Sequence, residues 1–189
     1  MFQTEKIVYF KEEGAVNTET VLGLVKERAE KLRIKSIVVA STGGETGVKA
    51  AETLKGYNVV VVSHSTGFQG RDIQELILEN RKRILKAGGK ILTATHAFGG
   101  VGRAIRRRFN TYQSNEIIAN TLRLFGEGTK VAVEIALMAA DAGLVSVQED
   151  LISIGGSSRG ADTALILRPA NVQDFFDVKV REIICKPWL

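Results

Sequence analysis

Four apolar segments of this chain each run directly into a loop of glycine, serine and threonine. The segments are Ile37–Ala40, Val59–Val62, Ile91–Ala94 and Leu151–Ile154. Apolar runs of this length, without polar alternation, are typical of strands in a parallel sheet that is covered on both faces. In such a sheet all four loops open at the carboxyl edge of the strands, which is where α/β proteins bind ligands.

Segments with helical periodicity separate these strands and predict parallel βαβ units with right-handed crossovers. The expected helices cover residues 18–32, 46–54, 71–87, 100–125 with a break near Asn110, and 131–142 with Thr129 as its cap. The segments at 150–154 and 163–167 are joined by a loop too short for a crossover, so we expect an antiparallel hairpin at one sheet edge. Residues 6–10 predict a further strand, and residues 178–185 predict a last, edge strand.

The composition of the chain is that of an ordinary globular domain. Its 189 residues are 44% hydrophobic and 25% charged, which predicts a single α/β domain over residues 1–189. No apolar run approaches the roughly 18 residues that a membrane span needs. A lone Cys185 allows no intrachain disulfide and, with no signal-peptide pattern, predicts a cytoplasmic protein. Cys185 stands in an apolar run, so we expect a buried, inert thiol.

The net charge is +5, and much of the excess lies in two clusters. One is Arg81–Arg83 with Lys86, and the other is Arg103 with Arg106–Arg108. These clusters are either solvated helix faces or the source of a field that attracts anionic ligands. The sequence has no recognisable nucleic-acid-binding motif, so a small anionic ligand is favoured over a nucleic acid.

The loop Ser41–Gly47 (S-T-G-G-E-T-G) is the strongest site motif. Its glycines let backbone amides approach an anion, its hydroxyls add donors, and the helix expected to begin near Thr46 points its positive end at the loop. Such a loop suits a phosphate monoester. An ordinary strand–helix turn with a threonine cap explains the same residues. No Gly-Lys-Ser/Thr follows, so the motif is not a Walker A loop.

Two further glycine-rich segments are candidate anion contacts. Gly99, Gly100 and Gly102 form a fragment of a dinucleotide fingerprint, but Ile105 stands at the third glycine position, and the acidic partner is missing. Arg103 could assist such a contact. Gly155 and Gly156 form either a third contact or only the hairpin turn.

The only two histidines, His64 and His96, both stand at predicted strand ends that face the same crevice. They are candidates for ligand contact, for acid/base catalysis, or for a structural role. Metal binding by the pair would need a further ligand, such as Glu116 or Asp162. We expect no metal site.

The segment Ile37–Thr46 (I-V-V-A-S-T-G-G-E-T) resembles the effector loop of the pyruvate kinase C-terminal domain. The order of the following elements agrees with that domain, up to the strand Asp150–Ile154 and its hairpin. The chain is also similar to a family of stand-alone archaeal and bacterial proteins with this fold and no assigned function, through Asn17-Thr18, S-T-G-G-E-T, Ser63-His64 and T-H-A-F-G-G. The resemblance implies a three-layer α/β/α sandwich, mostly parallel, with an antiparallel edge hairpin.

The resemblance implies that the Ser41–Thr46 loop holds a phosphorylated effector, and that the catalytic barrel of pyruvate kinase lies outside this chain, so we expect no pyruvate kinase activity. The loops at His64 and His96 are longer and richer in glycine than in that domain. A larger ligand, with flavin mononucleotide (FMN) or another nucleotide as the best candidate, could therefore be held with its ring against Phe68 or Phe98. The expected ligand-binding residues are Asn17, Thr18, Ser41, Thr42, Gly43, Gly44, Thr46, Ser63, His64, Thr66, Gly67, His96, Phe98, Gly99, Gly100, Gly102, Arg103, Gly155 and Gly156.

Two other functions stay open at this point. One is a hydrolase or lyase acting on a phosphorylated metabolite, with His64 or His96 as acid/base. The other is a regulatory module whose basic helices bind a protein or RNA partner. A homo-oligomer is expected on general grounds, because most soluble oligomers are symmetric assemblies of one chain.

Overall fold

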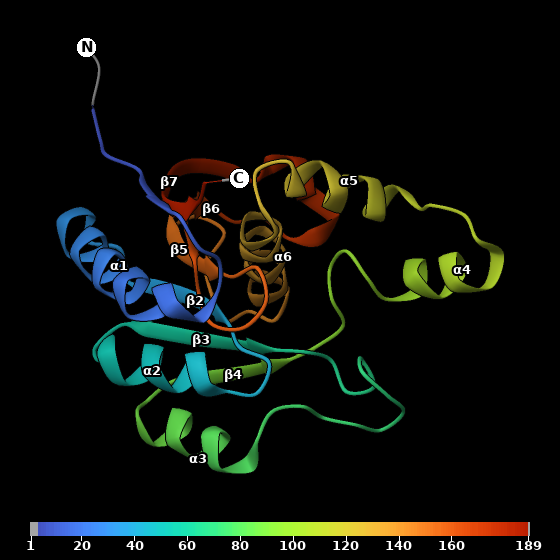
Figure 1. Cartoon of the computed structure of the whole chain (residues 1–189), viewed down its shortest axis with the longest axis horizontal. Helices are drawn as coiled ribbons and strands as arrows, with labels where there is room; N and C mark the ends of the chain where they lie inside the picture. Colours follow the sequence, from blue (N-terminus) through green and yellow to red (C-terminus); the bar gives the residue numbers. More distant parts are fainter. Residues whose placement is uncertain (1–3, 189) are drawn as a thin grey trace.

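A computed structural model describes residues 4–188 and forms a seven-stranded sheet with helices on both faces (Figure 1). In chain order the elements are β1 (Val8–Phe10), the 3-10 turn η1 (Ala15–Asn17), α1 (Thr18–Leu32), β2 (Ser36–Ala40), α2 (Glu45–Thr53), β3 (Asn58–Ser63), α3 (Leu78–Lys86), β4 (Lys90–Thr93), α4 (Val101–Phe109), α5 (Ser114–Arg123), α6 (Glu127–Asp141), β5 (Leu151–Gly155), β6 (Thr163–Arg168), η2 (Val172–Asp177) and β7 (Lys179–Pro187).

The strand order is β1-β7-β6-β5-β2-β3-β4. Strands β5, β2, β3 and β4 are parallel neighbours, and β5 and β6 form the predicted antiparallel hairpin. Beyond β6 the sheet continues with β7, which pairs antiparallel with β6, and then with β1, which pairs parallel with β7. The expectation that residues 178–185 form the last edge strand is therefore wrong, because β1 occupies that edge.

The valine-rich strands bury side chains on both faces because successive residues of a strand point to opposite sides. Ile37 and Val39 of β2 pack toward the layer of α1, α2 and α3. Val38 of β2 and Val60 of β3 pack toward α6 and the inner side of α5. The predicted three-layer sandwich is confirmed, and its core lies in two apolar layers on either side of the sheet.

The expected starts of two helices are wrong, whereas α1 covers the expected residues 18–32. Helix α3 begins at Leu78 rather than at residue 71, and the segment before it is an extended loop in which Ile73 is exposed. Helix α6 begins after Gly126, so Thr129 lies inside its first turn and donates to the Phe125 carbonyl instead of capping the helix. At α1, Asn17 occupies the cap position, but its side chain donates to the Glu12 carbonyl and makes no capping bond.

Helices α4 and α5 are separated by Asn110, which has the left-handed conformation (φ 51°) that ends α4. The predicted break near this residue is confirmed. Helix α4 has no buried residue and projects from the body of the domain at the right of Figure 1. Among residues 4–188, no helix is both long and apolar enough to cross a membrane.

Candidate functional site

The four glycine-, serine- and threonine-rich loops follow β2, β3, β4 and β5, which all run parallel. The loops therefore lie at one edge of the sheet, as expected. A cavity of about 170 Å³ opens where β2, β3 and β4 end, against one side of α6. Its lining includes six of the predicted site residues, all of them polar or basic, namely Ser41, Thr42, Ser63, His64, His96 and Arg103.

His64 is held between a hydroxyl and a carboxylate. Its Nδ1 lies 2.8 Å from Oε2 of Glu75, and its Nε2 lies 3.4 Å from Oγ1 of Thr42. The ring also packs against Phe68, with ring centroids 4.1 Å apart. The Glu75 carboxylate favours a proton on Nδ1, which leaves Nε2 to face Thr42.

His96 stands on the other side of Phe68, and the two rings are stacked with centroids 4.8 Å apart. Its Nδ1 lies 3.8 Å from Oε2 of Glu134, and its Nε2 accepts a hydrogen bond from the Ser65 amide at 3.4 Å. The centroids of the two histidine rings are 5.2 Å apart. Both histidines thus share one crevice, and each has a carboxylate beside Nδ1.

Glu134 is the buried carboxylate of the site. One oxygen accepts a hydrogen bond from the Phe98 amide at 3.0 Å, and the other lies 2.5 Å from Nζ of Lys130. Burial raises the pKa of Glu134, but the neighbouring His96 ring and the charge and hydrogen bond of Lys130 outweigh burial and lower that pKa to about 2. Glu134 therefore carries a full negative charge at neutral pH.

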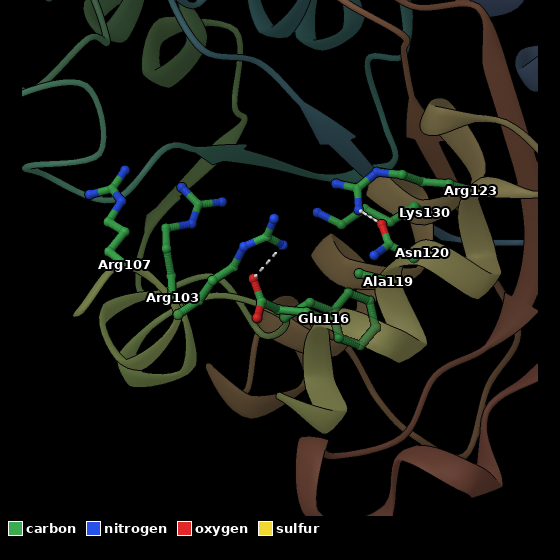
Figure 2. Close-up of a pocket in the computed structure, with 9 residues that line it drawn as sticks. Arg103, Arg107, Glu116, Ala119, Asn120, Arg123 and Lys130 are labelled. Carbon is green, nitrogen blue, oxygen red and sulfur yellow. Dashed lines mark hydrogen bonds and ion pairs between the residues drawn. The ribbon is translucent and has the colours of Figure 1, made fainter. Parts of the chain in front are cut away.

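A second cavity of about 280 Å³ adjoins the first and shares Arg103, Arg123 and Lys130 with it. Figure 2 shows Arg103 and Arg107 extending from α4 on one side of this cavity and Arg123 and Lys130 on the opposite side. Three of its cationic side chains have carboxylate partners, in the pairs Arg106–Glu116, Arg123–Glu127 and Lys130–Glu134. Among the described residues, Arg103 and Arg107 have no carboxylate within ion-pair distance.

The loop after β2 is built to hold its backbone in place. Ser41 is buried, and its Oγ accepts a hydrogen bond from the Gly47 amide, while the Gly43 carbonyl accepts bonds from Asn80 and Ile77. Gly44 has φ +102°, and a Cβ there would lie 2.5 Å from Cβ of Asn80. Within residues 4–188, the amides of residues 43–46 have no hydrogen-bond acceptor.

The loop after β4 packs against the core of the protein through Phe98, one of the expected ligand-binding residues. Phe98 is buried in the core beside α6, and it also lines the cavity of about 280 Å³. The side-chain amide of Asn115 donates to the carbonyl of Phe98 and, more weakly, to that of Gly99. A Cβ at Gly102 would lie 2.6 Å from the Asn115 side chain, so this glycine permits close packing of α4 on α5. Gly100 precedes α4 with φ +60°.

The loop after β5 lies away from the cavity, beside the start of α1. The buried carboxylate of Asp162 accepts hydrogen bonds from the amides of Gly14 and Ser157, at 2.9 and 3.0 Å. Thr18 accepts a bond from the Ala161 amide through Oγ1. Gly155, Gly156, Asn17 and Thr18 therefore do not line the cavity with His64. An internal carboxylate occupies the place in this loop that the sequence suggested for an anion.

Thr46, Thr66 and Gly67 also stand outside the cavity lining. Thr46 is buried in the first turn of α2. Thr66 accepts a hydrogen bond from Gln74, and the Gly67 amide donates to the Ile73 carbonyl, so both residues shape the long loop between β3 and α3. The structure thus places six of the nineteen expected residues in the lining of this cavity, and most of the others contribute to local packing.

The alternative in which both histidines bind a metal with Glu116 or Asp162 does not fit the geometry. Glu116 pairs with Arg106 and Asp162 holds the loop beside α1, so neither joins the histidines.

The expected burial of Cys185 is confirmed, and burial raises the pKa of its thiol to about 12.

Sequence inspection missed Glu75, Arg123, Lys130 and Glu134, which stand next to the histidines or line the cavities. One signal was available for Glu134, because it interrupts an otherwise apolar run in α6. Glu75 had no comparable signal, since it stands in a segment whose periodicity predicted a helix.

The chain belongs to the family described as the pyruvate kinase alpha/beta domain, whose model matches residues 19–167. Among solved structures it is similar to a pyruvate kinase from Cryptosporidium parvum, with 15% identity over 81% of this chain and 23% of that one, and a TM-score of 0.43. It also matches an O-ureido-L-serine synthase, with 22% identity over 69% of this chain and 40% of that one, and a TM-score of 0.32. The chain thus spans about a quarter of the length of the pyruvate kinase that it matches.

Proposed function

We propose that the protein binds a phosphate-bearing small molecule in the crevice at the carboxyl edge of β2, β3 and β4. The observation that carries this proposal is the convergence of Arg103, Arg123 and Lys130 on the cavity that Thr42 and His64 also line. Arginine forks recognise phosphate oxygens through paired hydrogen bonds, and partial burial strengthens such bonds relative to water.

The charge balance of the two cavities supports an anionic ligand. Arg123 and Lys130 each have a carboxylate partner, but Arg103 and Arg107 bring positive charge without one among the described residues. The guanidinium of Arg103 now lies over the Phe68 ring, 4.5 Å from its centroid. A phosphate placed between Arg103 and Arg123 would neutralise this excess.

The dimensions of the site favour a ligand that spans both cavities. The inner cavity of about 170 Å³ is smaller than typical ligand pockets, which measure about 300–1,000 Å³, but the adjoining cavity adds about 280 Å³. FMN or another nucleotide is the specific ligand that we propose. Its ring would take the place against Phe68 that the guanidinium of Arg103 occupies.

Two experiments test this proposal. The first records the near-ultraviolet and visible absorbance of freshly purified protein, with mass spectrometry of whatever heating releases. The second measures the thermal midpoint with FMN, with inorganic phosphate and with riboflavin, which lacks the phosphate. A ligand at about 100 times its dissociation constant stabilises the folded state by about 2.7 kcal/mol, so specific binding gives a clear shift.

The matched variants for the thermal measurement are Arg103→Gln, which removes a cation from both cavities, and Arg81→Gln, which removes one from the exposed side of α3. We expect FMN to shift the midpoint of the wild type and of Arg81→Gln, and the shift to shrink in Arg103→Gln. Equal shifts with riboflavin and FMN, or no shift with any phosphorylated compound, would contradict the proposal.

A hydrolase or lyase acting on a phosphorylated metabolite is the second candidate function. The observation in its favour is that each histidine has a carboxylate beside Nδ1, as catalytic histidines commonly do. In that case His64→Ala or His96→Ala would abolish turnover of a phosphorylated substrate while its binding survives.

A further inference from the structure

We propose that Thr42, His64 and Glu75 form a nucleophile–base–carboxylate relay that hydrolyses small carboxylic esters. The three side chains stand in a row, with Thr42 Oγ1 3.4 Å from His64 Nε2 and His64 Nδ1 2.8 Å from Glu75 Oε2. This is the order of groups that activates a hydroxyl nucleophile on several unrelated folds. We expect the longer of the two contacts, between Thr42 and His64, to shorten when substrate is bound.

The fold brings these residues together by position. Thr42 stands two residues after the end of β2, and His64 directly follows β3; the two strands are adjacent and parallel, so both residues lie at the same edge. The chain then leaves the sheet and returns, so that Glu75 reaches the far side of the His64 ring. The returning segment is fixed by the bond from the Gly67 amide to the Ile73 carbonyl and by Gln74, which donates to the His64 carbonyl.

The two ring nitrogens of His64 have different hydrogen-bond partners and therefore different roles. Nδ1–H of His64 donates a hydrogen bond to the Glu75 carboxylate, which leaves the lone pair of Nε2 directed at the Thr42 hydroxyl. His96 lacks this arrangement, because its Nε2 accepts the Ser65 amide. His64 is therefore the base of this relay, and Glu75 is a positioning residue.

The backbone amides that follow Thr42 are the donors that we assign to the developing oxyanion. The amides of Gly43 and Gly44 come directly after Thr42 and precede α2, and within residues 4–188 neither amide has a hydrogen-bond acceptor. Gly44 can take its positive φ without strain because it lacks a Cβ. Backbone amides next to a nucleophile stabilise the negative oxygen of a tetrahedral intermediate.

The reaction follows from these positions. Thr42 Oγ attacks the ester carbonyl carbon, and its proton passes to His64 Nε2. The tetrahedral intermediate collapses, the bond from the carbonyl carbon to the alcohol oxygen breaks, and the alcohol leaves with the proton from His64. Water then attacks the carbonyl carbon of the acyl-Thr42 ester and gives a proton to His64 Nε2. The bond from that carbon to Thr42 Oγ1 breaks, Oγ1 takes the proton back from His64, and the carboxylic acid leaves.

The cavity sets the class of substrate. Its volume of about 170 Å³ admits a short acyl group, and Arg103 and Lys130 lie in its lining where an anionic substituent would be held. The preferred substrate is thus a short-chain ester that carries a phosphate or carboxylate. This preference rests on the proposed function, whereas the acylation of Thr42 does not.

The test uses 4-nitrophenyl acetate, a neutral ester that reports the relay without a phosphate. We expect release of nitrophenolate above the buffer rate and an acetyl group on the peptide that contains Thr42, detected by mass spectrometry. Thr42→Val, which keeps the side-chain shape, and His64→Ala should lower the rate about 10²–10⁴-fold. Thr42→Ser should restore it, and Thr121→Val on α5 should match the wild type.

Glu75→Gln tests the positioning role, because it should lower kcat while KM stays unchanged. No hydrolysis above buffer by the wild type, or equal rates in Thr42→Val and Thr121→Val, overturns the relay. Failure of FMN binding with intact ester hydrolysis would instead overturn the phosphate proposal and leave the relay standing. FMN binding without hydrolysis of the ester would do the reverse.

Discussion

Lys130 and Glu134 form an ion pair inside α6, with Nζ of the lysine 2.5 Å from Oε2 of the glutamate and both side chains buried. The two residues stand one helical turn apart; Lys130 lines both cavities, and Glu134 lines the smaller one. A buried ion pair contributes little net stability, because desolvation of both charges opposes their attraction. We infer that the pair serves the candidate site, because Glu134 lies beside His96 and can orient its ring.

The lowered pKa of Glu134 predicts a specific pH dependence of stability. Its pKa falls from an ordinary 4.5 to about 2, so between these values the unfolded chain binds more protons at this carboxyl than the folded protein does. The free energy of unfolding should therefore rise with pH across this window, by about 3 kcal/mol from this group, and the contribution is lost as pH falls through about 2.

Urea unfolding at a series of pH values checks this prediction. Glu134→Gln should lose the slope in that window and should be destabilised by about 3–5 kcal/mol at neutral pH, because Lys130 keeps a buried charge without its partner. Glu127→Gln removes the more exposed carboxylate beside Arg123 and should change stability by no more than about 1 kcal/mol. An unchanged slope in Glu134→Gln would show that other carboxyls cause the pH dependence.

Asp162 ties the β5–β6 loop to the start of α1 through amides far apart in the chain. Asp162→Asn keeps the size of the side chain but removes the charge that strengthens its bonds to Gly14 and Ser157. We expect a loss of about 1.5–3 kcal/mol in the free energy of urea unfolding. Asp141→Asn, at an exposed carboxylate that also accepts a backbone amide, is the control and should lose less than about 1 kcal/mol.

Two glycines should respond in opposite directions to alanine. A Cβ at Gly155 would lie 2.2 Å from the Gly128 carbonyl oxygen, so Gly155→Ala should push β5 from α6 and cost about 1–3 kcal/mol or more. Gly23 lies inside α1 with open space around it, so Gly23→Ala should stabilise the protein by about 0.5–1 kcal/mol. Thermal or urea unfolding of both variants gives the comparison. A Gly155→Ala variant as stable as wild type would contradict this close packing of β5 against α6.

The sequence predicted the sheet well where local and tertiary preferences agree. The apolar runs of β2 and β3 are buried on both faces, so composition alone indicates strands in the middle of a sheet. The start of α3 could not be predicted, because Gln74 donates to the His64 carbonyl and Glu75 bonds the His64 ring, and these tertiary bonds hold an extended loop where periodicity favours a helix. The position of β7 depended on its pairing with β1, a contact between the two ends of the chain that no local pattern encodes.

The candidate site was predicted in outline but not in its charges. Strand ends and glycine loops located the crevice and both histidines, because parallel strands share one carboxyl edge. The partners came from elsewhere. Glu75 stands in a loop whose path is determined by tertiary contacts. Arg123, Lys130 and Glu134 reach the cavity from the helices that cover the sheet.

The most direct test of the central claim is a calorimetric titration of the protein with FMN and, side by side, with riboflavin. If charged contacts of Arg103 and its neighbours hold the phosphate, FMN should bind and riboflavin should bind about 10- to 100-fold more weakly. Equal affinity for the two compounds, or no heat with FMN or any other phosphorylated small molecule, would contradict the assignment of this crevice as a phosphate-binding site.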